Sequence, residues 1–125
     1  MPYIMLVNGE PFGYVQAYRI GDYERYAATL DLYDSEAVGI DIFIGEDQHR
    51  DRGLGAAAIR QFLAEEVFRR PNASTAIIAP EPDNKRGIRS YEKAGFRHVK
   101  TVFVEESGDD EYVMALSREE FESQR

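Results

Sequence analysis

Two stretches of the chain combine glycines with charged or aromatic residues at spacings that could support chemistry. In the first, the alternating segment Gly39–Glu46 leads into a glycine-containing turn, Arg50–Gly55, and apolar residues then recur at helical spacing. A strand, a glycine turn and a helix N-terminus together present backbone N–H groups to an anion. We therefore interpret the turn as an anion cradle. The alternative is that its glycines only permit tight packing.

The second stretch, Asn84–Phe96, has the pattern of a capped helix that Gly95 ends before a new strand begins. Tyr91 lies on this helix, where it could be an ordinary core aromatic residue. Upstream, Asp41 places a carboxylate in an apolar strand, and an unpaired carboxylate inside a sheet costs several kcal/mol. Asp41 therefore pairs with an arginine, lies on a wet sheet face, or has a functional partner such as an ammonium group.

Composition limits the chemistry that the chain can support. There is no cysteine and no Gly-x-Ser-x-Gly elbow, so a covalent acyl-enzyme has no obvious nucleophile. His49 and His98 lack the spacing of metal ligands, so no metal is expected. The turn at Arg50–Gly55 is not a P-loop, because no Gly-Lys-Ser/Thr follows its glycines.

Together, Arg50-x-x-Gly53-x-Gly55 and Asn84–Phe96 closely resemble the acetyl-coenzyme A signature of the GNAT N-acetyltransferase superfamily. The similarity continues through Asn8–Tyr14 and Gly39–Asp41, where the chain resembles the aminoglycoside 6′-N-acetyltransferase branch. The resemblance implies an α/β (α+β) GNAT fold for residues 1–125 as a single domain, with a mixed sheet, a central parallel pair and flanking helices. It also implies acetyl-CoA as the cosubstrate.

The resemblance further implies a role in cofactor binding for several residues. It places the coenzyme A pyrophosphate on the backbone N–H groups of Arg50, Asp51, Arg52, Gly53, Leu54 and Gly55. It places the acyl end of the cofactor along Phe43, Ile44 and Gly45, with the Gly45 N–H directed to the acetyl carbonyl. It brings Asn84, Arg86 and Arg89 to the cofactor or its phosphates. The alternatives are a bulge or strand end at Gly45, a simple helix cap at Asn84, and arginines that only coat the helix.

The same resemblance assigns the catalytic and acceptor-binding residues. Asp41 is expected to bind the acceptor ammonium and to take its proton, directly or through water, with Glu46 as a second acceptor-binding residue. Tyr91 matches the superfamily tyrosine that lies near the cofactor sulfur and acts as a general acid. The expected reaction is direct attack of an amine on the thioester.

Length and charge limit the classes of molecule that the chain could bind. A chain of 125 residues with 43% hydrophobic content forms one globular domain. Its formal charge of −8 argues against nucleic-acid binding. No apolar run predicts a membrane span and no signal peptide predicts secretion, so a cytoplasmic location is expected. Carboxylates dominate from Asp22 to Asp47 and cations from Arg50 to Lys100. This asymmetry suits a small cationic acceptor and a polyanionic cofactor, although both runs could be solvated surface.

Periodicity and turn residues predict the order of the elements. Strands are expected at Tyr3–Val7, Phe12–Ile20, Gly39–Glu46, Ser74–Ala79, Phe96–Val104 and Glu111–Leu116, and helices at Leu54–Arg70, Asn84–Ala94 and Ser117–Arg125. Because a helix connects Gly39–Glu46 to Ser74–Ala79, these two strands should be parallel. Gly21–Val38 is irregular and could be a loop with a short strand or a helical turn. Its tyrosines could contact substrate or pack as a lid.

The chain departs from the branch pattern in two places. Ala79-Pro80 stands where an aspartate commonly precedes the proline, and the superfamily's first strand and two helices do not precede the Asn8-Gly9 hairpin. The exposed edge of Tyr3–Val7 would then favour a homodimer, unless Gly21–Val38 covers it. The predicted function is acetyl transfer to a primary amine of an aminoglycoside-like acceptor. The alternatives are acetylation of a protein amine or another metabolite amine, and a catalytically silent coenzyme A-binding module.

Overall fold

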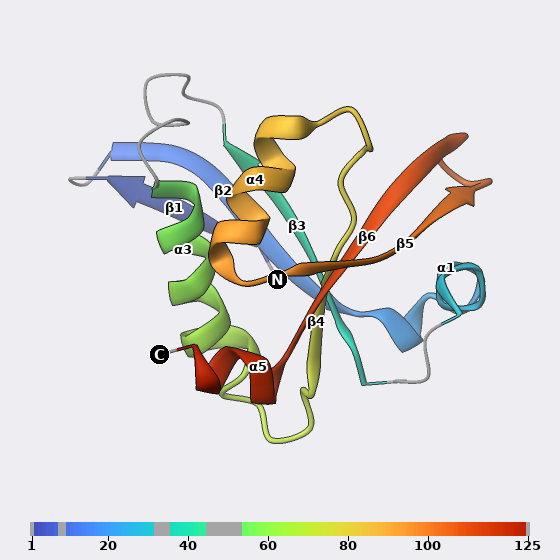
Figure 1. Ribbon diagram of the computed structural model, residues 1–125. Coiled ribbons are helices and arrows are strands. Elements are labelled where there is room, and N and C mark those ends of the chain that lie inside the picture. The colour runs from blue at the N-terminus through green and yellow to red at the C-terminus, as the bar shows by residue number, and fades with distance from the viewer. Residues whose placement is uncertain (1, 8–9, 32–35, 45–53, 125) are drawn as a thin grey trace.

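The structure, a computed structural model, describes residues 2–7, 10–31, 36–44 and 54–124. Within them, six strands form one sheet: β1 Pro2–Val7, β2 Glu10–Arg19, β3 Val38–Ile44, β4 Thr75–Ile78, β5 Arg97–Val104 and β6 Asp109–Ser117 (Figure 1). The helices are η1 Ile20–Asp22, α1 Glu24–Leu30, α3 Leu54–Phe62, η2 Leu63–Val67, α4 Lys85–Ala94 and α5 Arg118–Ser123. No helix in these segments is long and apolar enough to cross a membrane.

The sheet is mixed, with its parallel pair in the middle. The strand order is β1-β2-β3-β4-β6-β5. β3 and β4 are parallel, and the other neighbouring strands are antiparallel. This confirms the predicted parallel pair, which follows from the helical crossover that joins the two strands.

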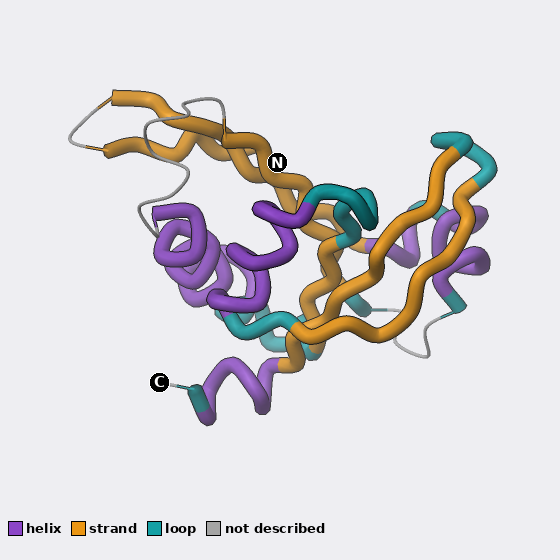
Figure 2. The backbone as a smooth tube through the Cα atoms, turned by 45° about the horizontal axis from the view of Figure 1, so that its top comes forward, coloured by secondary structure: helices purple, strands orange, loops and turns teal. Residues whose placement is uncertain are grey.

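The parallel pair separates soon after it forms. Across the described residues, β3 and β4 are in register only at Val38↔Ala76 and Gly39↔Ile77. β4 ends at Ile78, whereas β3 continues to Ile44 with β2 still paired along its other side. Figures 1 and 2 show the β1–β2 and β5–β6 hairpins extending on opposite sides of α4. The sheet therefore opens at its centre, at the carboxyl ends of two parallel strands.

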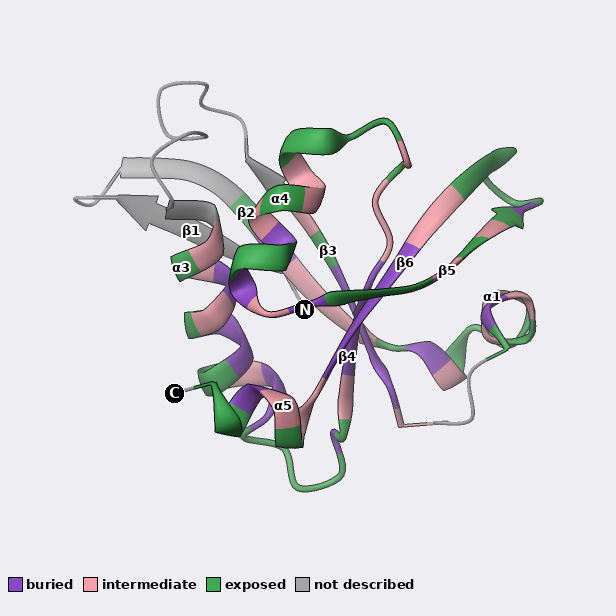
Figure 3. Cartoon of the chain, in the orientation of Figure 1, coloured by how far each residue is buried: buried purple, intermediate pink, exposed green. Residues whose placement is uncertain are grey.

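Alternation along the strands divides the core between the two sheet faces. One face packs against α3, α4 and α5, with Ile40, Ile78 and Met114 among its buried residues. The other face packs beneath α1, where Leu30 and Val113 are fully buried. Figure 3 shows the buried residues along β4 and β6 and on the inner side of α3.

Two segments refine or correct the sequence prediction. The helix predicted to run to Arg70 changes at Leu63 into a π-helical turn, in which the Phe68 N–H donates to the Leu63 carbonyl at 2.7 Å. The wider turn keeps Leu63, Val67 and Phe68 buried together. The irregular segment after β2 contains η1 and α1, so the helical turn is the alternative that the structure shows there.

Candidate functional site

A cavity of about 880 Å³ lies at the central opening of the sheet. Its walls come from β2, α1, β3, the end of β4, the start of α4 and the β5–β6 hairpin. Its polar lining consists of Gln16, Tyr18, Tyr23, Glu24, Arg25, Tyr26, Asp41, Asn84, Tyr91, Glu106, Ser107 and Glu111. The position agrees with the general tendency of ligands to bind outside the carboxyl ends of parallel strands.

Asp41 reaches the cavity from β3, two residues beyond the last register pair with β4. Its side chain is exposed, and the Nε2 of its cross-strand partner Gln16 donates to Asp41 Oδ2 at 3.0 Å. Of the alternatives left open by the sequence, the structure shows Asp41 on a solvent-exposed face of the sheet, with the Gln16 amide as its observed hydrogen-bond partner. An exposed carboxylate held by a neutral donor keeps its charge for an incoming cation.

Tyr91 reaches the same cavity from α4. It is only 8% exposed and belongs to the core cluster on the α3–α4 face. Tyr91 is therefore a core residue that also lines the cavity. Burial, and then the negative charge of Asp41, raise the pKa of Tyr91 to about 12. Tyr91 is therefore protonated at neutral pH and can donate a proton or a hydrogen bond.

Asn84 and the arginines of α4 are the residues that the sequence analysis assigned to the cofactor. The Asn84 side chain accepts from the Gly87 N–H at 3.0 Å, which confirms the predicted cap, and Asn84 also lines the cavity. Gly95 ends α4 at a φ of 113°, a conformation that favours glycine. Arg86 and Arg89 are exposed on α4, so their predicted contact with coenzyme phosphates stays a prediction.

The predicted cradle is bounded by the expected elements. Phe43 and Ile44 are the last residues of β3, and Leu54 and Gly55 are the first of α3, so a strand leads into the turn and a helix follows it. The other predicted residues of this region lie outside the described residues: Gly45, Glu46, Arg50, Asp51, Arg52 and Gly53. Their roles stay predictions.

A tyrosine–carboxylate cluster that the sequence did not predict forms the far wall of the cavity. The Tyr26 hydroxyl donates to Glu111 Oε1 at 2.8 Å, and it is also in hydrogen-bonding contact with Tyr18. Burial is the main cause that raises the pKa of Tyr18, of Tyr26 and of Glu111, and the Tyr26 hydrogen bond opposes the shift of Glu111. Glu111 occupies a core-facing position of β6, which its alternation with Val113 could have indicated.

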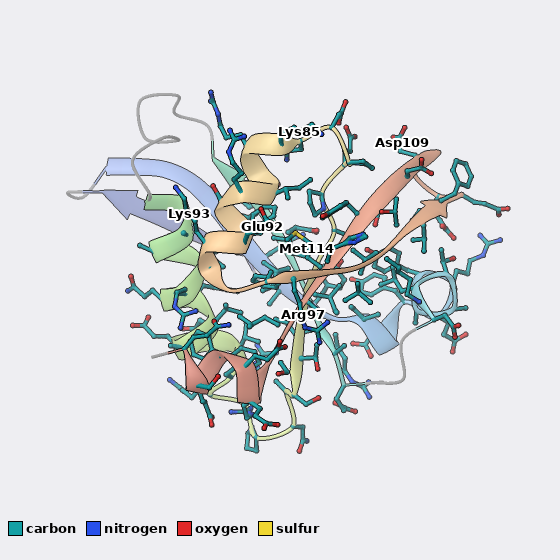
Figure 4. The ribbon with its side chains drawn as sticks, viewed as in Figure 1. Lys85, Glu92, Lys93, Arg97, Asp109 and Met114 are labelled. Atoms are coloured by element: carbon teal, nitrogen blue, oxygen red, sulfur yellow. The ribbon has the colours of Figure 1, made fainter. Side chains whose placement is uncertain are left out.

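The lining is acidic. It contains four carboxylates, Glu24, Asp41, Glu106 and Glu111, and Arg25 is its only lysine or arginine among the described residues. Figure 4 shows Asp109 at the start of β6, where Asp110 and Glu111 follow it in the sequence. Of the four lining carboxylates, the predicted acidic segment supplies Glu24 and Asp41, and the hairpin supplies Glu106 and Glu111. The field of this cavity favours a cationic ligand.

The described residues contain no group of three or more His, Cys, Asp or Glu side chains that could hold a metal ion. His98 is exposed and stacks on Tyr112, with ring centroids 4.0 Å apart, as expected for a residue of the sheet surface. His49 lies outside the described residues.

Comparison with known families adds an independent observation. A family model described as an acetyltransferase (GNAT) domain matches residues 1–104. The chain belongs to this GNAT family. The resemblance read from the sequence and the predicted GNAT fold are thereby confirmed.

Two similar proteins have names that refer to aminoglycosides or to kanamycin resistance. The aminoglycoside N(6′)-acetyltransferase type 1 of Klebsiella pneumoniae is 36% identical over 125 residues, which cover 99% of this chain and 60% of that protein. A kanamycin resistance protein of Rhizobium radiobacter is 37% identical over 87 residues, covering 70% of this chain and 78% of that protein. The GNAT chain thus spans well under two thirds of the length of the first relative.

Solved structures agree in fold. The crystal structure of aminoglycoside acetyltransferase AAC(6′)-Ib in complex with coenzyme A has a TM-score of 0.81 and 32% identity, covering 99% of this chain and 69% of that one. A second crystal structure of the same enzyme, with coenzyme A and kanamycin, has the same score and covers 70% of that chain.

Proposed function

We propose that this GNAT domain transfers an acetyl group from acetyl-CoA to a primary amine of an aminoglycoside or similar polycation. The observation that carries the proposal is the acidic cavity at the opening between β3 and β4, with Asp41 and Tyr91 both in its lining. A cavity lined by four carboxylates attracts a polyamine and disfavours an anionic acceptor. The names of the similar proteins support the same acceptor class.

The proposed cofactor site uses the backbone of the opened strand. Over Ile40–Ile44, β3 pairs with β2 on one side. On the other side, the described residues of β4 pair with β3 only at Val38 and Gly39. Backbone N–H and C=O groups on that second side need partners, which an extended ligand lying along the strand could provide. In the proposal, Phe43, Ile44 and Gly45 meet the acyl arm and the turn at 50–55 holds the pyrophosphate.

In the proposed reaction, acetyl-CoA supplies the acyl group and the residues of the cavity handle charge and protons. Asp41 binds the acceptor ammonium and receives its proton, directly or through water, which frees the nitrogen lone pair. The protonated Tyr91 hydroxyl then serves as the acid for the departing thiolate. The chain has no cysteine for a thiolate nucleophile, so direct attack is the simplest path.

A second candidate, acetylation of a different amine, is favoured by one observation. Ala79, which belongs to the cavity lining, stands where the aminoglycoside branch commonly has an aspartate. Loss of that carboxylate would remove one contact for a polycationic antibiotic, so another metabolite amine or a protein amine would become a better substrate.

The test measures coenzyme A release with acetyl-CoA and three acceptor classes: kanamycin, spermidine and a lysine-containing peptide. We expect the highest kcat/KM with kanamycin. Preference for spermidine or the peptide would establish the second candidate. Coenzyme A binding in a calorimeter without turnover of any acceptor would show a catalytically silent module instead.

A further inference from the structure

One wall of the cavity rests on a very short helix. α1 has seven residues, and its first turn and the residue before it contribute Tyr23, Glu24, Arg25 and Tyr26 to the lining. A helix of this length is not stable alone in water, so contacts with the rest of the fold must determine its position. The position of α1 therefore sets the shape of that wall.

The C-terminal end of α1 is held by a lysine from a distant strand. Lys100 of β5 donates from Nζ to the carbonyl of Leu30 at 2.5 Å and to the carbonyl of Asp31 at 3.3 Å. Carbonyls at a helix C-terminus have no partner inside the helix, and the negative end of the helix dipole attracts a cation. Asp31, at a φ of 50°, ends the helix there.

A β-bulge directs Lys100 toward α1. In the pairing of β5 with β6, His98 is opposite Met114 and Lys100 is opposite Val113, so Val99 is passed over. Val113 is buried in the cluster that contains Leu30 of α1. Without the bulge, Val99 would be opposite Val113 and Lys100 would point to the other face. The bulge thus leaves Val99 38% exposed and brings an ammonium group to the end of the helix.

A second tie joins the first turn of α1 to the same hairpin. Tyr26 donates to Glu111 of β6, and Glu111 is opposite Val102, two residues beyond Lys100 on the same face of β5. Two polar contacts therefore tie α1 to the hairpin, near its start through Tyr26 and at its end through Lys100, in addition to the burial of Leu30 in the core. Rotation about the Tyr26 contact would move the lining residues if the Lys100 contact were lost.

We propose that Lys100 is a positioning residue for the acceptor: by holding the C-terminal end of α1, it fixes the helical wall that carries Tyr26 and Glu24 into the cavity. The acceptor part of this inference rests on the proposed function. Lys100 itself lies outside the cavity lining, so it acts through α1 and does not touch the reacting groups.

The test compares Lys100→Met with Lys93→Met, which removes an exposed lysine on α4. Hydrogen exchange, measured without acceptor, should rise about tenfold or more in the amides of residues 24–31 of Lys100→Met and stay unchanged in α3 and α4. The acceptor KM should rise roughly tenfold while kcat and coenzyme A affinity change less than about twofold. Lys100→Arg should have an acceptor KM close to that of the wild type, because arginine can still donate to the helix carbonyls. Lys93→Met should match the wild type in both measurements.

Unchanged exchange in α1 would overturn the inference, as would increased exchange with an unchanged acceptor KM. A fall in kcat and in coenzyme A affinity together with the KM effect would also overturn it, because it would show general damage to the fold. If the wild-type chain transfers no acetyl group to any acceptor, the proposed function fails, whereas the exchange measurement still decides whether Lys100 holds α1.

Discussion

Asp41 and Tyr91 bring two different chemical properties to the cavity. Asp41 is exposed and accepts a hydrogen bond from Gln16, so it offers a charged oxygen to a cation. Tyr91 is buried, and its pKa of about 12 keeps it protonated. In the proposed reaction, Asp41 is the base that is open to the acceptor and Tyr91 is the acid held in the core.

Removal of the Tyr91 hydroxyl should affect turnover much more than folding. In Tyr91→Phe the ring keeps its place in the core, and we expect kcat to fall by roughly ten- to a thousandfold. Steady-state kinetics at saturating substrates measure this, with thermal unfolding as the control for structure. Full activity of the variant would remove Tyr91 from the mechanism.

Asp41→Asn tests the acceptor carboxylate. The amide keeps the size and the contact with Gln16 but has no charge, so kcat/KM for kanamycin should fall by about a hundredfold while coenzyme A affinity changes little. Asp110→Asn, an exposed acidic residue of β6 outside the cavity lining, is the matched control and should match the wild type. Equal losses in both variants would point to net charge and not to Asp41.

Stability at alkaline pH reports on the burial of Tyr91. Its pKa is raised from 10.0 to about 12. The contribution of the protonated hydroxyl to the free energy of unfolding is therefore complete below pH 10 and is lost as pH rises through 12. We expect the free energy of unfolding of the wild type to decrease over this interval. In Tyr91→Phe the decrease should be smaller than in the wild type by up to about 3 kcal/mol. Denaturant titrations from pH 9 to 12 provide the comparison, and identical pH profiles would contradict the assigned burial.

At the scale of the elements, Gly39 shapes the cavity through the strand beside it. Gly39 is opposite Tyr18, and a Cβ at Gly39 would lie 2.4–2.7 Å from the Tyr18 ring and hydroxyl. The glycine therefore allows the ring to lie across β3, where it meets Tyr26. A side chain at this position would force the ring away from the cavity wall.

We expect Gly39→Ala to lower the free energy of unfolding by about 1–3 kcal/mol and to raise the acceptor KM. In a Tyr18→Ala background the ring is absent, so the same substitution should cost much less. Chemical denaturation of the four proteins gives the coupling energy. A cost that is equal in both backgrounds would show that the Tyr18 contact is not its source.

The sequence predicted the elements that have strong local signals. Asn84 and Gly95 delimit α4 as expected, because a cap and a left-handed glycine are local features. For the segment of α1 the sequence predicted a helical turn only as one alternative, and its position could not be predicted, because it depends on Lys100 and Glu111, which lie far along the chain. The bulge at Val99 likewise arises from pairing with β6 and has no local residue signature.

The candidate site follows the same division. Asp41 and Tyr91 could be selected from the sequence, since one breaks an apolar pattern and the other matches a family position. The inward position of Glu111 could have been read from strand alternation, but its contact with Tyr26 could not, because only the folded sheet brings a hairpin carboxylate to a helix from a different part of the chain. The cluster therefore required the structure.

At the scale of the whole molecule, the described sheet has two outer strands, β1 and β5. The unpaired edge of β1 favours pairing with a second copy, so we expect the 125-residue chain to form a symmetric homodimer. Light scattering over a concentration series measures the mass. A stable monomer of 14.3 kDa at every concentration would contradict the dimer.

The most direct test of the account is an initial-rate study in which acetyl-CoA and kanamycin are both varied, with the acetylated product identified by mass spectrometry. Direct transfer in the acidic cavity requires both substrates to be bound together, so we expect acetyl-kanamycin and intersecting double-reciprocal lines. Parallel lines, which indicate a covalent acetyl-enzyme, or the absence of acetyl-kanamycin under conditions where coenzyme A binds, would contradict it.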